Sequence, residues 1–215
     1  YDLTGPLLPW YDYNKTILPW RENKDPYTIS VSEIMLQQTR VEAVKPYFDR
    51  FMEAFPEVQD LAEADDERLM KMWEGLGYYN RARNLKAAAR KIVNEYDGKI
   101  PGDYDALLSL NGIGTYTAGA IGSIAFDLQV PAVDGNVMRV LSRLWGDDSD
   151  ILKEKTKREM GKRIQAYIPK DRPGDFNQAL IELGAIVCIP NGKPLCDRCP
   201  WDTVCRAYRE DRIDQ

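Results

Sequence analysis

The stretch Leu110-Asn-Gly-Ile-Gly-Thr-Tyr-Thr-Ala118 places two glycines, Gly112 and Gly114, one residue apart. Both neighbouring segments have the periodicity of a helix. Glycine permits positive φ, and such a turn leaves backbone N–H groups facing outward at the N-terminus of the next helix, where they can bind a phosphate. The same G-x-G spacing also occurs in ordinary turns, so this stretch has to be read with the rest of the chain.

Most of the chain outside this turn repeats apolar residues at spacings of three and four, which is the period of an amphipathic helix. The clearest runs are residues 44–55, 85–96, 137–145 and 176–187. Asp25-Pro26 reads as a helix cap and first helical residue, Pro56 as the end of a helix, and Gly98 with Pro101 as the end of another. The sequence therefore predicts an all-α fold of about ten short helices.

The composition restricts what this chain can do. With 215 residues and 44% hydrophobic content it can fill a core, and its net charge of −5 argues against coating nucleic acid by bulk electrostatics. A polyanion such as nucleic acid would have to bind to a local patch of basic residues. Because the chain has no histidine, its chemistry must come from carboxylates, amides, tyrosines or cysteines. With no secretory signal and no apolar run of membrane-spanning length, we expect a cytoplasmic protein.

Glu33 lies among Ile29, Val31, Ile34 and Met35 in an apolar segment. Burial disfavours the charged form of a carboxyl group, so its pKa should be raised, which suits a general acid at neutral pH. The alternative is that Ser30 and Glu33 form a capping box. We rank the capping box lower because a helix that begins at Asp25-Pro26 puts Glu33 in its third turn.

Asp134 precedes the strongly amphipathic segment 137–145, where it can serve as a helix N-cap. A carboxylate there would stay ionised, with its pKa lowered by the helix dipole. A plain cap is the simpler interpretation for this residue alone. Glu33 and Asp134 together would supply one protonated and one ionised carboxyl group, the division that glycosidic bond cleavage requires.

All four cysteines of the chain, Cys188, Cys196, Cys199 and Cys205, fall in one 18-residue window near the C-terminus. Scattered buried cysteines explain such clustering poorly, and disulfides are disfavoured in an intracellular protein. Four thiolates could hold a structural zinc ion or an iron-sulfur cluster, and spacing alone does not decide between them.

Five stretches, taken in order, resemble the endonuclease III superfamily of DNA glycosylases, and more closely the catalytic part of MutY-type adenine DNA glycosylases. They are Val31-Ser-Glu-Ile-Met-Leu-Gln-Gln-Thr39, Trp73-Glu-Gly-Leu-Gly-Tyr-Tyr79, Leu110-Asn-Gly-Ile-Gly114, Ala132-Val-Asp-Gly-Asn-Val137 and the cysteine window. The resemblance extends from Leu18-Pro-Trp-Arg21 to Cys205, and five motifs in order are far more specific than any one alone.

The resemblance implies a helix-hairpin-helix DNA glycosylase fold. A six-helix barrel domain would span residues 22–130, and a discontinuous domain would join residues 1–21 to 131–215. It also implies a 4Fe-4S cluster on the four cysteines, with the cluster loop at 188–205. The family spacing has six residues in the first cysteine interval where this chain has seven, and a loop tolerates such an insertion. The Nudix-like domain of full-length MutY-type enzymes would be missing from this chain.

The resemblance also implies roles for individual residues. Glu33 would protonate adenine, Asp134 would stabilise or capture the sugar cation, and Tyr116 and Asn136 would assist. Gln38 and Tyr78 match residues that wedge into the duplex. The positions lining the adenine pocket are Trp20, Arg21, Leu36 and Gln178, and the family admits Glu or Gln at the last. The DNA backbone would be met by Gly112, Gly114, Lys193 and Arg198.

The implied substrate is double-stranded DNA with an A:8-oxoguanine or A:G mispair, bound by a bacterial monomer acting on nucleoid DNA. Relatives that also nick the strand carry a lysine two residues after the second glycine, where this chain has Tyr116, and no lysine occurs from Ile100 to Leu152. We therefore predict a monofunctional glycosylase. The basic run at residues 81–91 is interpreted as a solvated helix face. A mismatch thymine glycosylase and a non-catalytic helix-hairpin-helix module are the alternatives.

Overall fold

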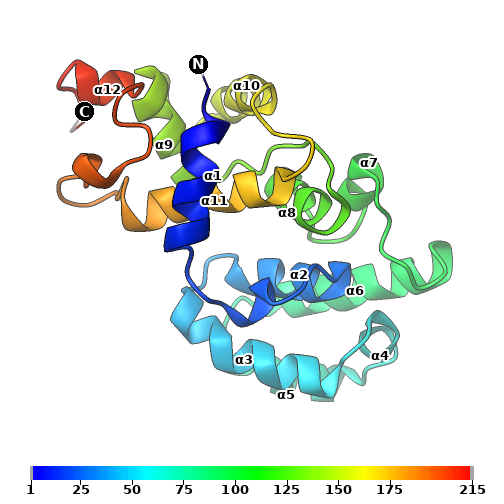
Figure 1. Ribbon diagram of the computed structural model, residues 1–215. Helices are drawn as coiled ribbons and strands as arrows, with labels where there is room; N and C mark the ends of the chain where they lie inside the picture. Colours follow the sequence, from blue (N-terminus) through cyan, green and yellow to red (C-terminus); the bar gives the residue numbers. More distant parts are fainter. Residues whose placement is uncertain (1, 214–215) are drawn as a thin grey trace. The chain divides into compact units, whose positions relative to one another are not determined.

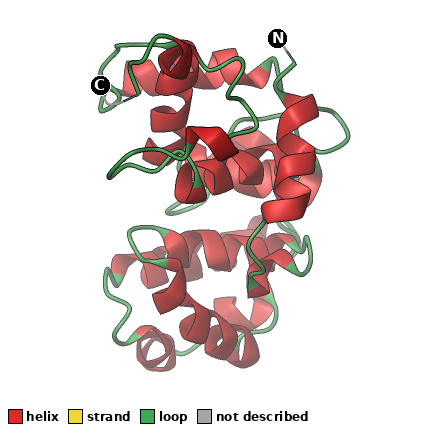
Figure 2. Cartoon of the chain, turned by 60° about the vertical axis from the view of Figure 1, so that its left-hand side comes forward, coloured by secondary structure: helices red, strands yellow, loops and turns green. Residues whose placement is uncertain are grey.

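The computed structural model describes residues 2–213, and in that range all regular structure is helical, without strands (Figure 2). The all-α prediction is therefore confirmed. Between residues 2 and 213, twelve α-helices and two 3-10 helices follow one another. Figure 1 labels the α-helices. The elements are α1 (Thr4–Asn14), η1 (Pro19–Arg21), α2 (Pro26–Leu36), α3 (Val41–Ala54), α4 (Val58–Ala62), α5 (Asp66–Trp73), α6 (Asn80–Glu95), α7 (Tyr104–Leu108), α8 (Thr115–Phe126), α9 (Gly135–Trp145), α10 (Glu154–Gln165), α11 (Pro173–Ile186), η2 (Cys196–Arg198) and α12 (Arg206–Arg209).

The chain divides into two compact units. One, the 17–126 unit, is continuous. The other, the discontinuous unit, combines the described residues up to Thr16 with those from Asp127 onward. The sequence prediction drew its domain limits at 22 and 130, so the observed unit begins and ends a few residues earlier in the chain.

The 17–126 unit contains helices α2 to α8, of which α4 and α7 have only five residues each. Helix α2 begins as the sequence predicts: Asp25 is its N-cap, accepting a hydrogen bond from the Thr28 backbone N–H at 3.0 Å, and Pro26 is its first residue. Helix α3 ends just before Pro56, and Gly98 follows α6 with φ of +74°. Helix α2 packs against α3, α6 and α8, so its side chains are buried on nearly every side.

The discontinuous unit is built on α9 and α11, which pack against each other. The amphipathic face of α9 contributes Val137, Leu141 and Leu144 to its core. Helix α1 lies across α11, as Figure 1 shows, and joins the start of the chain to this core. Several hydrogen bonds hold it there; for example, the Trp201 indole N–H donates to the carbonyl of Leu3 at 2.9 Å, and Thr4 donates to the carbonyl of Tyr167 at 3.0 Å.

In the range that the structure describes, no helix is both long and apolar enough to cross a membrane.

Candidate functional site

Glu33 is a buried carboxyl group on α2, with 9% of its surface exposed. Its neighbours Val31, Ile34 and Met35 are at most 2% exposed, so the carboxyl group lies in a helix that is otherwise core. The capping-box alternative is excluded, because the helix is capped by Asp25 and the Ser30 hydroxyl instead donates to the carbonyl of Pro26 at 2.6 Å. The burial predicted for Glu33 is thus confirmed.

The residues predicted to line the base pocket from this unit come from η1 and the end of α2. Trp20 is buried, and its ring packs edge-on against Phe48 with centroids 5.4 Å apart, so it also belongs to the core. Arg21 and Leu36 are half-buried. Trp20 and Arg21 precede the N-terminal end of α2, whereas Leu36 is the last residue at its C-terminal end.

The predicted hairpin connects α7 to α8, and the structure confirms the helix-turn-helix order. Only Gly112 has positive φ, at +77°, whereas Gly114 does not. The carbonyl of Gly114 accepts the first hydrogen bond of α8, from the N–H of Ala118 at 2.9 Å. Both glycines are exposed, and Tyr116 is half-buried in the first turn of α8. The turn thus presents backbone at a helix N-terminus, the arrangement that suits a phosphate.

Gln38 and Tyr78, the two predicted wedge residues, line the same open cavity of about 380 Å³. They come from different loops, one after α2 and one before α6. Both have positive φ, 58° for Gln38 and 48° for Tyr78, which costs a side chain other than glycine roughly 1–3 kcal/mol. Tyr78 is 62% exposed. The structure therefore brings together two residues in strained backbone conformations with their side chains at the surface.

Asp134 is the N-cap of α9, as predicted: its carboxylate accepts a hydrogen bond from the Val137 backbone N–H at 2.8 Å. The other carboxylate oxygen accepts a longer one from the Asn136 side chain at 3.4 Å. Asn136 in turn accepts a hydrogen bond from Arg139 at 2.9 Å. The two residues that the sequence assigned to one catalytic centre are therefore in contact.

Gln178 is half-buried on α11, where its side-chain oxygen accepts a hydrogen bond from the Tyr11 hydroxyl at 3.2 Å. An amide oxygen has two lone pairs, so this single bond leaves both the oxygen and the nitrogen of the side chain able to bind a base. Like Asp134 and Asn136 it belongs to the discontinuous unit, whereas Glu33 belongs to the 17–126 unit.

All four cysteines line one cavity, together with Arg143, Val187 and Pro194 among others. Two donors reach the sulfur atoms: the Arg143 guanidinium donates to Cys188 Sγ at 3.2 Å, and the Trp201 N–H to Cys199 Sγ at 3.4 Å. Burial, with smaller contributions from the neighbouring cysteines, raises the pKa of the Cys199 thiol to about 12. In the described residues no three His, Cys, Asp or Glu side chains have the geometry to hold one metal ion.

The residue set fits a group bound through thiolates. The four cysteines line a common cavity, the exposed surface of that cavity is apolar, and N–H groups donate to two of the sulfurs, as in protein sites for iron-sulfur clusters. Lys193 and Arg198 are exposed in the segment that carries these cysteines. The extra residue of the first interval falls in the loop closed by the hydrogen bond from Leu195 N–H to the carbonyl of Val187 at 2.9 Å.

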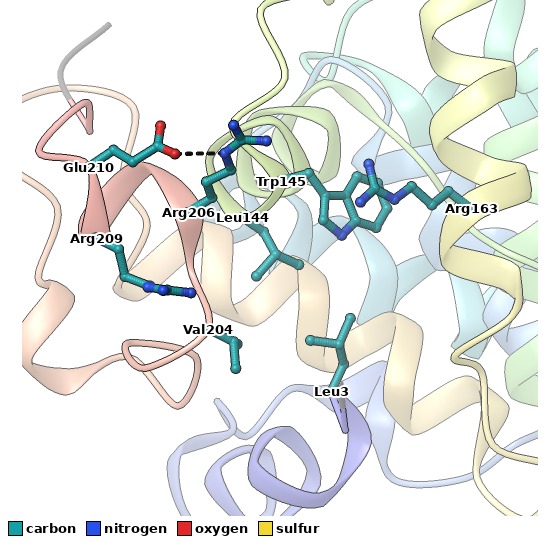
Figure 3. A pocket seen from close by; sticks show the side chains of 8 residues that line it. All are labelled: Leu3, Leu144, Trp145, Arg163, Val204, Arg206, Arg209 and Glu210. Atoms are coloured by element: carbon teal, nitrogen blue, oxygen red, sulfur yellow. Dashed lines mark hydrogen bonds and ion pairs between the residues drawn. The ribbon is translucent and has the colours of Figure 1, made fainter.

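A larger cavity of the discontinuous unit contains none of the predicted site residues. It measures about 440 Å³ and is lined by Leu3, Leu144, Trp145, Arg163, Val204, Arg206, Arg209 and Glu210 (Figure 3). The Arg163 guanidinium stacks over the Trp145 ring at 4.1 Å, and Arg206 pairs with Glu210 at 2.7 Å. Because these internal contacts occupy two of its three arginines, we assign the cavity no part in the candidate site.

The burial of Arg81, which lies beside the loops that carry Gln38 and Tyr78, was predicted wrongly from the sequence. Arg81 belongs to the basic run at 81–91 that we interpreted as a solvated face, yet it is only 8% exposed. Lys86 of the same run is 6% exposed and forms an ion pair with Asp66. A signal was present: Arg81 stands four residues before Leu85 and seven before Ala88, so it shares the face of α6 that faces the core.

The comparisons with known proteins show the family to which this chain belongs. Residues 31–166 match the family described as HhH-GPD superfamily base excision DNA repair protein. Among curated relatives, the adenine DNA glycosylase of Mus musculus is 47% identical over 94% of this chain, which spans 41% of that relative's length. A thermostable thymine-DNA glycosylase structure superposes with a TM-score of 0.86 at 30% identity, covering 95% of this chain and 94% of the other.

A structure described as a trapped endonuclease III-DNA covalent intermediate superposes with a TM-score of 0.76 at 25% identity, over 95% of this chain and 94% of the other. The family match covers more than half of the chain and includes Glu33, the glycine hairpin and Asp134. This chain belongs to the HhH-GPD superfamily of base excision DNA repair proteins.

Proposed function

We propose that this chain is the catalytic part of a monofunctional DNA glycosylase that hydrolyses the N-glycosidic bond of adenine mispaired with 8-oxoguanine or guanine. The observation that carries the proposal is the contrast between two carboxyl groups. Glu33 is buried in an apolar helix, whereas Asp134 caps a helix and accepts a backbone N–H and an amide N–H. The adenine DNA glycosylases among the relatives support adenine as the base.

In the proposed reaction the target base leaves the stack, since its reacting atoms are inaccessible inside a duplex. Glu33 donates its proton to a ring nitrogen, and the C1′–N bond breaks with both electrons going to the base. The sugar is left as a cation. The ionised Asp134 stabilises it or bonds to C1′, after which water adds to C1′ and gives up a proton. Asn136 holds the Asp134 carboxylate in place, and Tyr116 would assist from the first turn of α8.

The remaining predicted residues would bind DNA. Trp20, Arg21, Leu36 and Gln178 would line the base pocket. The hairpin glycines, Lys193 and Arg198 would meet the phosphates, which makes binding fall steeply with salt despite the net charge of −5. Relatives described as DNA complexes support a duplex as the partner. The monomeric state and the cytoplasmic location stay predictions.

The four cysteines would hold a 4Fe-4S cluster, which when bound supplies a rigid anchor for the segment 188–205. The cavity that they share and the N–H donors at two sulfurs support this assignment. Purified protein should contain iron and show the visible absorption of a cluster. Zinc in place of iron would contradict it.

The test of the proposed function is single-turnover base release from duplexes carrying A opposite 8-oxoguanine, A opposite G and T opposite G. We expect adenine to be released, and Glu33→Gln to lower the rate by about 10²-fold or more because the proton donor is lost. Glu53→Gln, which changes an exposed glutamate on α3, is the matched control and should keep the parent rate.

Other outcomes identify the alternatives. Release of thymine instead of adenine would indicate a mismatch thymine glycosylase. Tight duplex binding without release of any base would indicate a non-catalytic DNA-binding module. A protein-DNA adduct trapped by borohydride would contradict a monofunctional reaction.

A further inference from the structure

Arg81 is a buried guanidinium at the second position of α6, beside the loops that carry Gln38 and Tyr78. Burying a charge is unfavourable unless hydrogen bonds replace the lost water. The partners of Arg81 therefore show what its burial stabilises, and they fall into two groups.

The first group belongs to the end of α2 and the loop that follows it. One terminal nitrogen of Arg81, Nη1, donates to the carbonyls of Ile34 at 3.1 Å, Met35 at 2.8 Å and Gln37. The other, Nη2, donates to the Thr39 hydroxyl at 3.0 Å. Gln38 lies between the last two acceptors in the sequence, so Arg81 binds the chain on both sides of it.

The second group belongs to the loop before α6. Nη2 also donates to the carbonyls of Leu76 at 3.5 Å and Gly77 at 3.2 Å, and Nε donates to the carbonyl of Tyr78 at 3.4 Å. The guanidinium carbon lies 5.5 Å from the centre of the Tyr78 ring, within the range of a cation-π contact. Arg81 thus holds both the backbone and the ring of Tyr78.

The acceptors of Arg81 are neutral carbonyls and one hydroxyl. Its hydrogen bonds therefore do not serve to neutralise a buried carboxylate. They join two loops that are about 40 residues apart in sequence, and each loop contains one residue other than glycine with positive φ. Only the planar guanidinium, with five N–H groups in a fixed fork, can serve so many acceptors in two directions.

We propose that Arg81 is a positioning residue that fixes Gln38 and Tyr78 together, at the separation and in the backbone conformation in which they enter a mispaired duplex. The inference rests on the proposed function, since it needs these two side chains to act on DNA. It adds that their action depends on a third residue, Arg81, which lines the same cavity and is only 8% exposed.

The proposal is tested first on the protein without DNA. Hydrogen-deuterium exchange would be measured on residues 36–40 and 75–79 in the parent, in Arg81→Lys and Arg81→Met, and in Arg90→Met as the control. Arg90 is an exposed arginine on the same helix, so its variant removes one positive charge without touching these loops. We expect exchange in both segments to speed up by about tenfold or more in the Arg81 variants only.

Protection unchanged in either segment would overturn the proposal, because Arg81 would then not hold both loops. Thermal melting checks that each variant is folded. Arg81→Lys keeps the charge, so it carries the test if Arg81→Met does not fold.

The second measurement is a double-mutant cycle on duplex affinity and single-turnover adenine release. In the parent background Arg81→Lys should slow release by about 10- to 100-fold, because a small misplacement at a site has an effect of this size. In a Gln38→Ala, Tyr78→Ala background the same change should have less than about a threefold effect, since the groups it positions are gone.

Equal effects of Arg81→Lys in both backgrounds would overturn the proposal and leave Arg81 a merely structural residue. A parent that releases no adenine would defeat the proposed function. The exchange measurement and the affinity cycle would then still decide whether Arg81 acts through Gln38 and Tyr78.

Discussion

Three glycines of the 17–126 unit allow the stability of the hairpin turn to be tested by the same change, glycine to alanine. At Gly112, φ is +77° and an added Cβ would lie 2.9 Å from Cβ of Asn84. At Gly98, φ is +74° and no atom lies within 4 Å of the added Cβ. At Gly114, φ is not positive and the added Cβ also meets nothing within 4 Å.

These differences set the expected loss in the free energy of unfolding. Forcing alanine into the left-handed region costs about 1–2 kcal/mol, so Gly98→Ala should lose about that much. At Gly112 the clash adds roughly 1–3 kcal/mol, since the Cβ of Asn84 is fixed to the backbone of α6 and cannot rotate away. Gly112→Ala should therefore lose about 2–5 kcal/mol in total. Gly114→Ala should change stability by at most about 0.5 kcal/mol.

Urea unfolding followed by far-UV circular dichroism measures all three variants. In thermal melting each 1 kcal/mol should appear as a shift of about 2–4 °C for a chain of this size. The expected order of destabilisation is Gly112, then Gly98, then Gly114. A Gly112→Ala protein no less stable than Gly114→Ala would refute the reasoning that the turn needs glycine for its conformation and for its close approach to α6.

Three further predictions concern an ion pair, a thiol and a helix cap. Arg172 binds both carboxylate oxygens of Asp12 and lowers its pKa, so the pair stabilises the fold above the ordinary carboxyl pKa and less as pH falls through the lowered value. Arg172→Met should cost about 0.2–1 kcal/mol at pH 7 and the difference should shrink below about pH 3, as measured by urea unfolding across pH. Cys199→Ser should lower the iron content and the melting temperature of the protein, as determined by metal analysis and calorimetry. Asp25→Ala removes the cap hydrogen bond to Thr28 and should cost about 1 kcal/mol in the same unfolding assay, whereas an unchanged midpoint would show that the cap contributes nothing.

Much of the fold could be predicted because its signals are local. Asp25-Pro26 starts a helix by the chemistry of its own side chain and ring, and Pro56 stops one for a similar reason. The periodic run at 137–145 became α9, with Asp134 as its cap. The turn at Gly112 and the burial of Glu33 also depend mainly on neighbouring residues, and both were predicted correctly.

The role of Arg81 could not be predicted in the same way. A sequence pattern treats arginine as a solvated residue. The hydrogen-bond acceptors that compensate the burial of Arg81 come from residues 34–39 and 76–78, whose positions depend on tertiary packing. The positive φ of Gln38 and Tyr78 could not be predicted from the sequence either, since neither residue type favours it. Helix α1 was missed because its sequence has almost no amphipathic pattern and contains Pro9 inside the helix.

The attachment of α1 has a consequence for the order in which the chain folds during synthesis. The carbonyl of Leu3 is bound by Trp201, 198 residues later, so α1 cannot complete its packing until Trp201 has left the ribosome. The 17–126 unit needs nothing beyond Phe126 for its own core and can fold earlier, while α1 trails with Leu7, Leu8 and Tyr11 uncovered. A nascent chain of this protein therefore exposes the apolar side chains of α1 while the residues between it and Trp201 are made, which makes α1 a natural segment for a chaperone to hold.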